Sequence, residues 1–264
     1  MSQMVCTCGA NSNYQQQQQS GTDQQTQQRQ KRPPKPVVAA KDEVYAFIRA
    51  RREHYPVMKN YMVRESKIIE NYKGTIVGLA EKVCVLEAPL GGSNWVSPTT
   101  EDPRYCVLVI RFDSMRNANL WSFSDPIFKQ QDCLPPNEMI EGFIVPMKHL
   151  PPDDCKTFTM MNIRNVRDAQ AFQECYIDEV VPLLDDNNVE QGVVSTDEVQ
   201  PLRRSWVKRG DFIFVHQARR PDSLINVFNS EAYSRLRADR ENWAECETLM
   251  FTVSREPFRS ARRR

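Results

Sequence analysis

Histidine and arginine are the residues in this sequence whose type and position could carry chemistry. His216 is one of three histidines and lies near the end of an apolar run, residues 211–217, which alternates as a β-strand does. An imidazole titrates near neutral pH and can therefore transfer protons. We name His216 as the candidate catalytic residue. The alternative is a strand-end histidine that is satisfied by a backbone carbonyl or by water.

Three arginines are candidates for binding the carboxylate of a ligand. Arg51 and Arg164 each close a short apolar run, at residues 44–51 and 157–164, and Arg111 lies near the end of a third run. A planar guanidinium matches a carboxylate in geometry, so each arginine could fix a ligand. The alternative for these residues is a salt bridge at the end of a strand.

Three aromatic residues could line a ligand pocket, because such pockets are mostly apolar with a few polar groups. Tyr176 and Tyr233 lie on predicted helix faces, where the alternative is an ordinary place in the core. Trp95 lies in the Gly-rich segment Pro89–Trp95, where it could act as a lid or as an anchor for the loop.

Metal and cofactor motifs are missing from the sequence. The three histidines are too scattered to predict a metal triad. Cys6 and Cys8 have no partner pair that would complete a zinc site. The sequence has neither a glycine-rich phosphate loop nor a Gly-x-Ser-x-Gly elbow. We therefore predict no metal and no cofactor.

Two similar sets of elements position these residues. Residues 105–112 overlay residues 210–217 without a gap, which aligns Arg111 with His216. The runs that end at Arg51 and Arg164 overlay in the same way. Each copy has the order β-α-β-β-α-β. The predicted boundaries, in chain order, are a tail at 1–40, a first unit at 41–150 with a loop insertion at 88–104, a second unit at 151–256 and a basic tail at 257–264.

The predicted strands are apolar on both faces, which indicates a sheet that is covered on both sides. In the second copy, residues 168–184 place Phe172, Cys175, Tyr176, Val180 and Leu183 at helical spacing. One face of the sheet must take such helices, and the other copy's sheet is the nearest cover for the second face. The sequence therefore predicts an α+β fold with a barrel-like core inside one chain.

A family resemblance makes this fold more specific. The run Val180–Leu184, the strand at 211–217 and the segment Asn229–Glu241, with its Ser-Glu-Ala-Tyr and Leu-Arg-Ala-Asp-Arg-Glu elements, resemble the family named domain of unknown function 1330. The resemblance covers residues 157–253, while the first copy is similar only in outline. It implies a member of the dimeric α+β barrel superfamily, with two ferredoxin-like units packed sheet to sheet within one chain. Monooxygenases, isomerases and haem-degrading enzymes share that fold, so the resemblance implies no activity.

Composition bears on the partners and the compartment. The net charge is +1, which disfavours nucleic acid as a partner, because phosphate binding requires a broad basic surface. Residues 13–40 are Gln-rich and poor in apolar groups, which is typical of disorder. The eight cysteines follow no signal peptide, and no run is long enough to cross a membrane. We therefore predict a cytoplasmic protein that is a monomer or a homodimer.

Three functions remain open from the sequence. The first is a binding module for a small apolar or carboxylate ligand or for a protein partner. The second is a cofactor-independent monooxygenase or isomerase that uses His216 on a small aromatic or carbonyl compound, which requires a cavity that reaches this residue. The third is a tandem RNA-recognition-like protein, which requires Phe212 and Phe214 to face solvent.

Overall fold

The computed structural model describes residues 42–87, 104–129 and 140–255. All of them belong to one compact unit, residues 38–264. The predictions for the two tails, for Trp95 and for nearly all of the 88–104 insertion lie outside the described residues.

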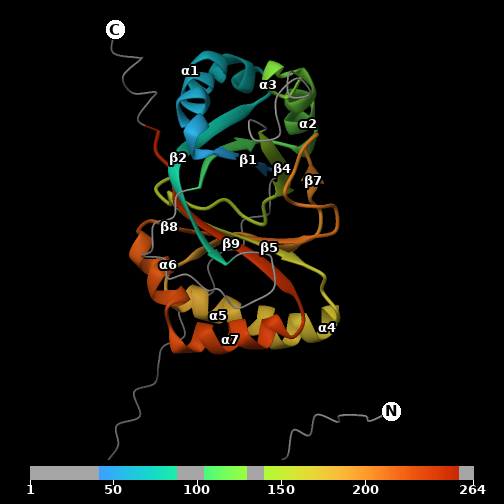
Figure 1. Ribbon diagram of the computed structural model, residues 1–264, viewed down its shortest axis with the longest axis vertical. Helices are drawn as coiled ribbons and strands as arrows, with labels where there is room; N and C mark the ends of the chain where they lie inside the picture. Colours follow the sequence, from blue (N-terminus) through green and yellow to red (C-terminus); the bar gives the residue numbers. More distant parts are fainter. Residues whose placement is uncertain (1–41, 88–103, 130–139, 256–264) are drawn as a thin grey trace, which may run out of the picture. The chain divides into compact units, whose positions relative to one another are not determined.

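The first half of the described chain alternates strands and helices (Figure 1). Its elements are β1 (Val44–Arg51), the 3-10 turn η1 (Arg52–His54), α1 (Tyr55–Asn71), β2 (Gly74–Glu87), β3 (Tyr105–Phe112), α2 (Met115–Ser124), α3 (Pro126–Lys129) and β4 (Glu141–Pro146).

The second half repeats this pattern with one additional short strand. Its elements are β5 (Thr157–Arg164), α4 (Ala169–Phe172), the π turn η4 (Gln173–Ile177), α5 (Asp178–Asp186), β6 (Glu190–Thr196), β7 (Gln200–Pro201), β8 (Phe212–Ala218), α6 (Pro221–Phe228), α7 (Glu231–Glu241) and β9 (Glu245–Thr252).

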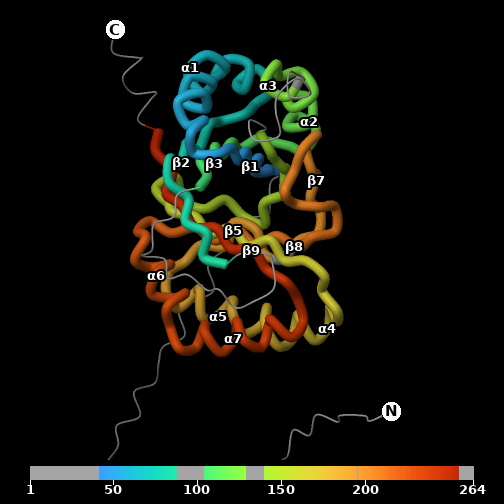
Figure 2. Tube along the Cα trace, in the orientation of Figure 1, coloured from blue at the N-terminus to red at the C-terminus, as the bar shows by residue number. Residues whose placement is uncertain are grey.

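The nine strands of the described residues form one antiparallel sheet in the order β6-β8-β5-β9-β2-β3-β1-β4-β7. The two halves meet where β2 pairs with β9, in the register Val83↔Phe251, and Figure 2 shows β2 running alongside the second half. At the other seam β7, which directly follows β6 in the chain, pairs with β4. The backbone N–H of Lys148 also donates to the carbonyl of Gly192 in β6 at 2.8 Å. The sheet therefore curls back on itself.

The inner face of the curled sheet is filled by large side chains from both halves. Phe47 and Phe143 of the first half share one buried cluster with Phe158 and Phe251 of the second. Phe158 and Phe251 stack with ring centroids 5.4 Å apart. The outer face carries two separate clusters, one in the first half with α1 and α2 and one in the second half with the helices α4 to α7.

Helix starts follow local capping chemistry. Side chains of Ser114, Asp168 and Ser230 accept hydrogen bonds from backbone N–H groups in the first turns of α2, α4 and α7. Helices α1 and α6 instead have a proline in the first turn, where the missing N–H costs nothing. These starts fix where the helices leave the strands that carry the candidate residues.

The π turn changes which side chains of the long helical segment face the core. The sequence predicts that Cys175 and Leu183 are buried, but Cys175 is exposed and Leu183 is only half-buried. The π turn at 173–177 adds a residue to one helical turn and so rotates the following face. Leu184 occupies the buried position instead.

The alignment of Arg111 with His216 is wrong by one residue. Arg111 pairs with Tyr45 on β1, and it is Gln217 that pairs with the equivalent Phe158 on β5. A one-residue shift in a strand moves a side chain to the opposite face. Arg111 therefore lies on the inner face with Gln217, whereas His216 lies on the outer face with the helices.

Candidate functional site at the polar end of the curled sheet

Charged side chains gather on the inner face where β1 and β5 end and where β4 and β9 begin. Successive residues of a strand point to opposite faces, so Arg49 and Arg51 lie on the same face as Phe47. Arg164 has the position on β5 that Arg51 has on β1. Glu141 and Glu247 are contributed by β4 and β9. We call these residues (Arg49, Arg51, Glu141, Arg164 and Glu247) the polar end.

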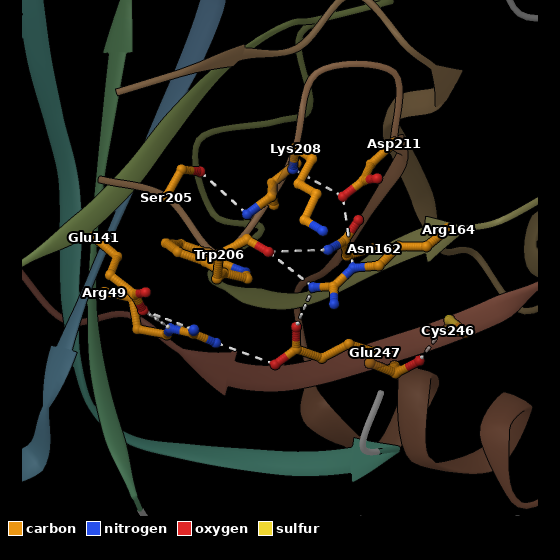
Figure 3. A network of polar contacts seen from close by, with 12 residues as sticks. Arg49, Glu141, Asn162, Arg164, Ser205, Trp206, Lys208, Asp211, Cys246 and Glu247 are labelled. Atoms are coloured by element: carbon orange, nitrogen blue, oxygen red, sulfur yellow. Dashed lines mark hydrogen bonds and ion pairs between the residues drawn. The ribbon is translucent and has the colours of Figure 1, made fainter. Parts of the chain in front are cut away.

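Arg49 is the centre of the polar end (Figure 3). Its Nε and Nη2 donate to Glu141 Oε2 at 3.1 and 2.7 Å, and its Nη1 donates to Glu247 Oε1 at 3.1 Å. The guanidinium lies between two rings, 4.5 Å from the centroid of Tyr105 and 4.3 Å from that of Trp206. Since Arg49 is only 7% exposed, these contacts hold its charge inside the fold and link the two halves.

Arg164 is engaged in the same network. Its Nη2 donates to the carbonyl of Trp206 at 2.8 Å and to Glu247 Oε2 at 3.2 Å. Its Nε lies 3.5 Å from Asp211 Oδ2. The ligand-binding role that the sequence predicts for Arg164 is not visible in these contacts, which instead fasten the segment before β8 to β5 and β9.

A hollow of about 870 Å³ opens beside the network. It is lined by Arg51, Arg52, Glu53, Tyr55, Pro56, Glu81, Arg104 and Tyr105, and we call it the arginine hollow. Arg51 belongs to both places, and the ring of Tyr105 in the hollow also lies against Arg49. Arg52 Nη2 lies 3.4 Å from Glu81 Oε1, whereas no ion pair of Arg51 is found within the described residues. The first turn of α1, which favours anions, forms part of the wall.

His216 is not among the residues that line the arginine hollow. It is 1% exposed, and Thr159 Oγ1 lies 3.1 Å from its Nδ1. Within the described chain its Nε2 is buried without a partner. Burial lowers the pKa of His216 to about 3, so the ring is neutral near pH 7 and stacks on Phe214. This environment gives the predicted proton-transfer role no support.

The remaining predicted residues divide between two other places. Arg111 lies at the opposite end of the inner face, with Nε 3.8 Å from Glu43 Oε2 and Nη1 3.7 Å from Asp153 Oδ1. Tyr176 and Tyr233 are fully buried in the outer core of the second half. The structure thus brings Arg51 and Arg164 to one end, brings the two tyrosines together and separates both sets from Arg111.

The aromatic residues of β8 do not form a stacking surface for RNA. Phe214 is fully buried, and Phe212 packs toward the helices with its centroid 6.3 Å from that of Phe172. Both belong to the helix side of the sheet. The prediction of an RNA-recognition surface is therefore wrong.

The described residues contain neither a grouped set of metal ligands nor a membrane-spanning helix. No three of their His, Cys, Asp or Glu side chains are grouped as they would be around a metal ion. None of the helices in this part of the chain is long and apolar enough to cross a membrane.

Sequence reasoning missed Arg49, Glu141, Glu247, Tyr105 and Trp206. A usable signal existed for two of them. Arg49 and Glu247 are charged residues at inner positions of largely buried strands, and such a charge is retained only when it finds a partner. The partners come from strands and a loop far away in the sequence, so spacing alone could not identify them.

Several solved structures are similar to this chain, all at low identity. A structure described as a putative monooxygenase from Fusobacterium nucleatum shares 9% identity at a TM-score of 0.43, covering 81% of this chain and 93% of that one. An anthrone oxidase-like protein shares 11% identity at a TM-score of 0.44, covering 83% and 94%. A mutant chlorite dismutase from Candidatus Nitrospira defluvii shares 10% identity at a TM-score of 0.44, covering 81% and 92%.

No family model matches the chain, and neither does any curated protein. At the identities and TM-scores above, the structural likeness carries no argument about chemistry.

Proposed function

We propose that the chain is an intrachain α+β barrel of the dimeric type, built from two ferredoxin-like units. The support is the repeated strand order, β2-β3-β1-β4 in the first half and β6-β8-β5-β9 in the second. In each half, the first and third strands are central and the strand after the first helix lies at the edge. Both seams between the halves are hydrogen-bonded.

We further propose that the protein is a non-catalytic binding module that takes a small carboxylate ligand in the arginine hollow. The observation that carries this function is the set of three arginines, Arg51, Arg52 and Arg104, around one open space with two glutamates. Glu81 lies beside Arg52, and no ion pair of Arg51 is found within the described residues, so we assign Arg51 as the anchor for an incoming carboxylate.

The filled interior favours binding over catalysis. An enzyme of the kind considered above needs a cavity that reaches His216, but the inner face is packed with Tyr45, Phe47, Phe143 and Phe158 among others. His216 itself is enclosed on the outer face. The arginine hollow, by contrast, is accessible and adjoins an aromatic ring.

Titration with sodium benzoate and sodium acetate at low ionic strength tests the proposal. Saturable binding to the unmodified chain is expected by calorimetry or by NMR shifts. Arg51→Ala should weaken it about 10-fold, the cost of losing one charged hydrogen-bonding partner. The matched control is Arg235→Ala, an exposed arginine on α7 that pairs with Glu231, and its affinity should be unchanged. Equal affinities of the two variants, or no saturable binding at all, would refute the proposal.

A further inference from the structure

A fully buried guanidinium lies in the outer core of the second half, on the opposite face of the sheet from the polar end. Arg240 on α7 is 0% exposed. Its Nη1 donates to Tyr176 Oη at 3.4 Å, and its guanidinium lies 5.4 Å from the centroid of that ring. A buried charge is retained only if it is paired and hydrogen-bonded.

The counter-charge comes from the other half of the chain. Glu87 is the last residue of β2, and its Oε1 accepts from Arg240 Nη2. Its Oε2 accepts from Thr248 Oγ1 at 3.1 Å. The preceding Leu86 is fully buried in the same cluster as Tyr176. The end of β2 thus places a carboxylate in a core that consists mostly of residues from the second half.

The other groups that act electrostatically on Arg240 are neutral near pH 7. Burial raises the pKa of Cys246 to about 12 and also raises the pKa values of Tyr176 and Tyr233. Glu87 is therefore the group that balances the guanidinium charge. Within the described chain, Arg240 Nε is a buried donor with no hydrogen-bond partner.

We propose that Arg240, Thr248 and Tyr176 form a carboxylate-binding site in the second half and that Glu87 of the first half occupies it as an internal ligand. The site recognises a carboxylate by one guanidinium and one hydroxyl, as a site for a free ligand would. Glu87→Ala keeps the Cβ atom and removes a fragment equivalent to acetate. Free acetate can then take the vacated place.

Thermal unfolding of the full chain in acetate and in chloride of equal ionic strength tests the proposal. Glu87→Ala should lower the Tm by roughly 10 °C, because it leaves a buried charge unpaired. Acetate in several-fold excess over its Kd should then raise the Tm of this variant about 3 to 5 °C more than chloride does. Acetate bound at the arginine hollow raises the Tm of the unmodified chain and of the variant alike, so the shift of the unmodified chain is subtracted from that of Glu87→Ala.

Two controls separate the site from general effects. Glu231→Ala removes an exposed carboxylate from α7, the helix that carries Arg240, and should give no acetate shift beyond that of the unmodified chain. Glu87→Ala combined with Arg240→Met removes the guanidinium and should abolish the shift. Equal effects of acetate and chloride on Glu87→Ala, or an equal acetate shift in the double variant, overturn the proposal.

The comparison remains decisive if Glu87→Ala does not accumulate as folded protein. Refolding yields from denaturant are then measured in acetate and in chloride. Acetate should raise the yield of Glu87→Ala but not that of the double variant with Arg240→Met. Yields that do not depend on the anion contradict an acetate-accepting site.

Discussion

At the scale of single residues, the role of a polar side chain in an apolar strand depends on the face of the sheet to which it points. Arg49 and Arg164 point inward and are held by Glu141 and Glu247. His216 points outward into an apolar layer of Phe214 and Phe228. The guanidinium keeps its charge by pairing, whereas the imidazole loses its charge through burial.

His216 should make stability depend on pH. Its pKa of about 3 in the folded chain lies below the ordinary value of about 6.5 in an unfolded chain. As the pH falls below 6.5, the unfolded state takes up the proton first, so stability is lost between pH 6.5 and about 3 and is intact above this range. Relative to His216→Phe, which cannot titrate, the unmodified chain should lose about 1.4 kcal/mol per pH unit in that window. Urea unfolding at pH 7, 6 and 5 measures the difference, and parallel pH profiles would contradict it.

At the scale of elements, the polar end joins strands that the sequence separates widely. Arg49 on β1 connects to Glu141 on β4 and to Glu247 on β9, and Trp206, from the loop before β8, covers the guanidinium. The network therefore connects β1 and β4 of the first half to β9 of the second half. Arg49 and Glu247 are shielded from water, so pairing matters here more than on the surface.

Arg49→Met should destabilise the fold strongly, because it leaves two glutamates without their shared partner. We expect a loss of about 3 kcal/mol in the free energy of unfolding. Arg52→Met is the matched control, since Arg52 and Glu81 form an exposed pair, and it should cost less than about 0.5 kcal/mol. Urea unfolding of both variants provides the comparison. Similar losses would show that the buried network contributes no more than a surface ion pair.

Strands and helices could be predicted from the sequence, because apolar periodicity reports which elements are buried. The runs ending at Arg51 and Arg164 are strands in equivalent positions, as the overlay predicts. The alignment of the β3 sequence with the β8 sequence is harder to predict. Both faces of these strands are apolar, so a shift of one residue leaves the pattern of apolar residues almost unchanged. The overlay of the two sequences therefore aligns Arg111 with His216, although their side chains lie on opposite faces of the sheet. Partners such as Trp206 depend on the folded chain and leave no local signal.

At the scale of the whole molecule, each half supplies something that the other lacks. Residues 83–87 of β2 pair with β9, and Leu86 packs in the outer core of the second half. In return β7 pairs with β4, and Leu202 packs in the outer core of the first half. The repeat in the sequence predicts two units at 41–150 and 151–256, but the contacts across both seams make one unit depend on the other for its core.

Separate expression of residues 1–150 and 151–264 tests this dependence. Alone, the first fragment would leave Leu86 and Glu87 without the core and the guanidinium that they contact, and the second would leave Arg240 buried without a counter-charge. We therefore expect neither fragment to show a cooperative thermal transition by circular dichroism. When the fragments are co-expressed, they should elute together from a size-exclusion column and unfold in one transition, because both seams can then form. A cooperative transition in the isolated first fragment would show that it is an independent domain. A cooperative transition in the isolated second fragment would show that the buried carboxylate of Glu87 is dispensable for the fold of that half.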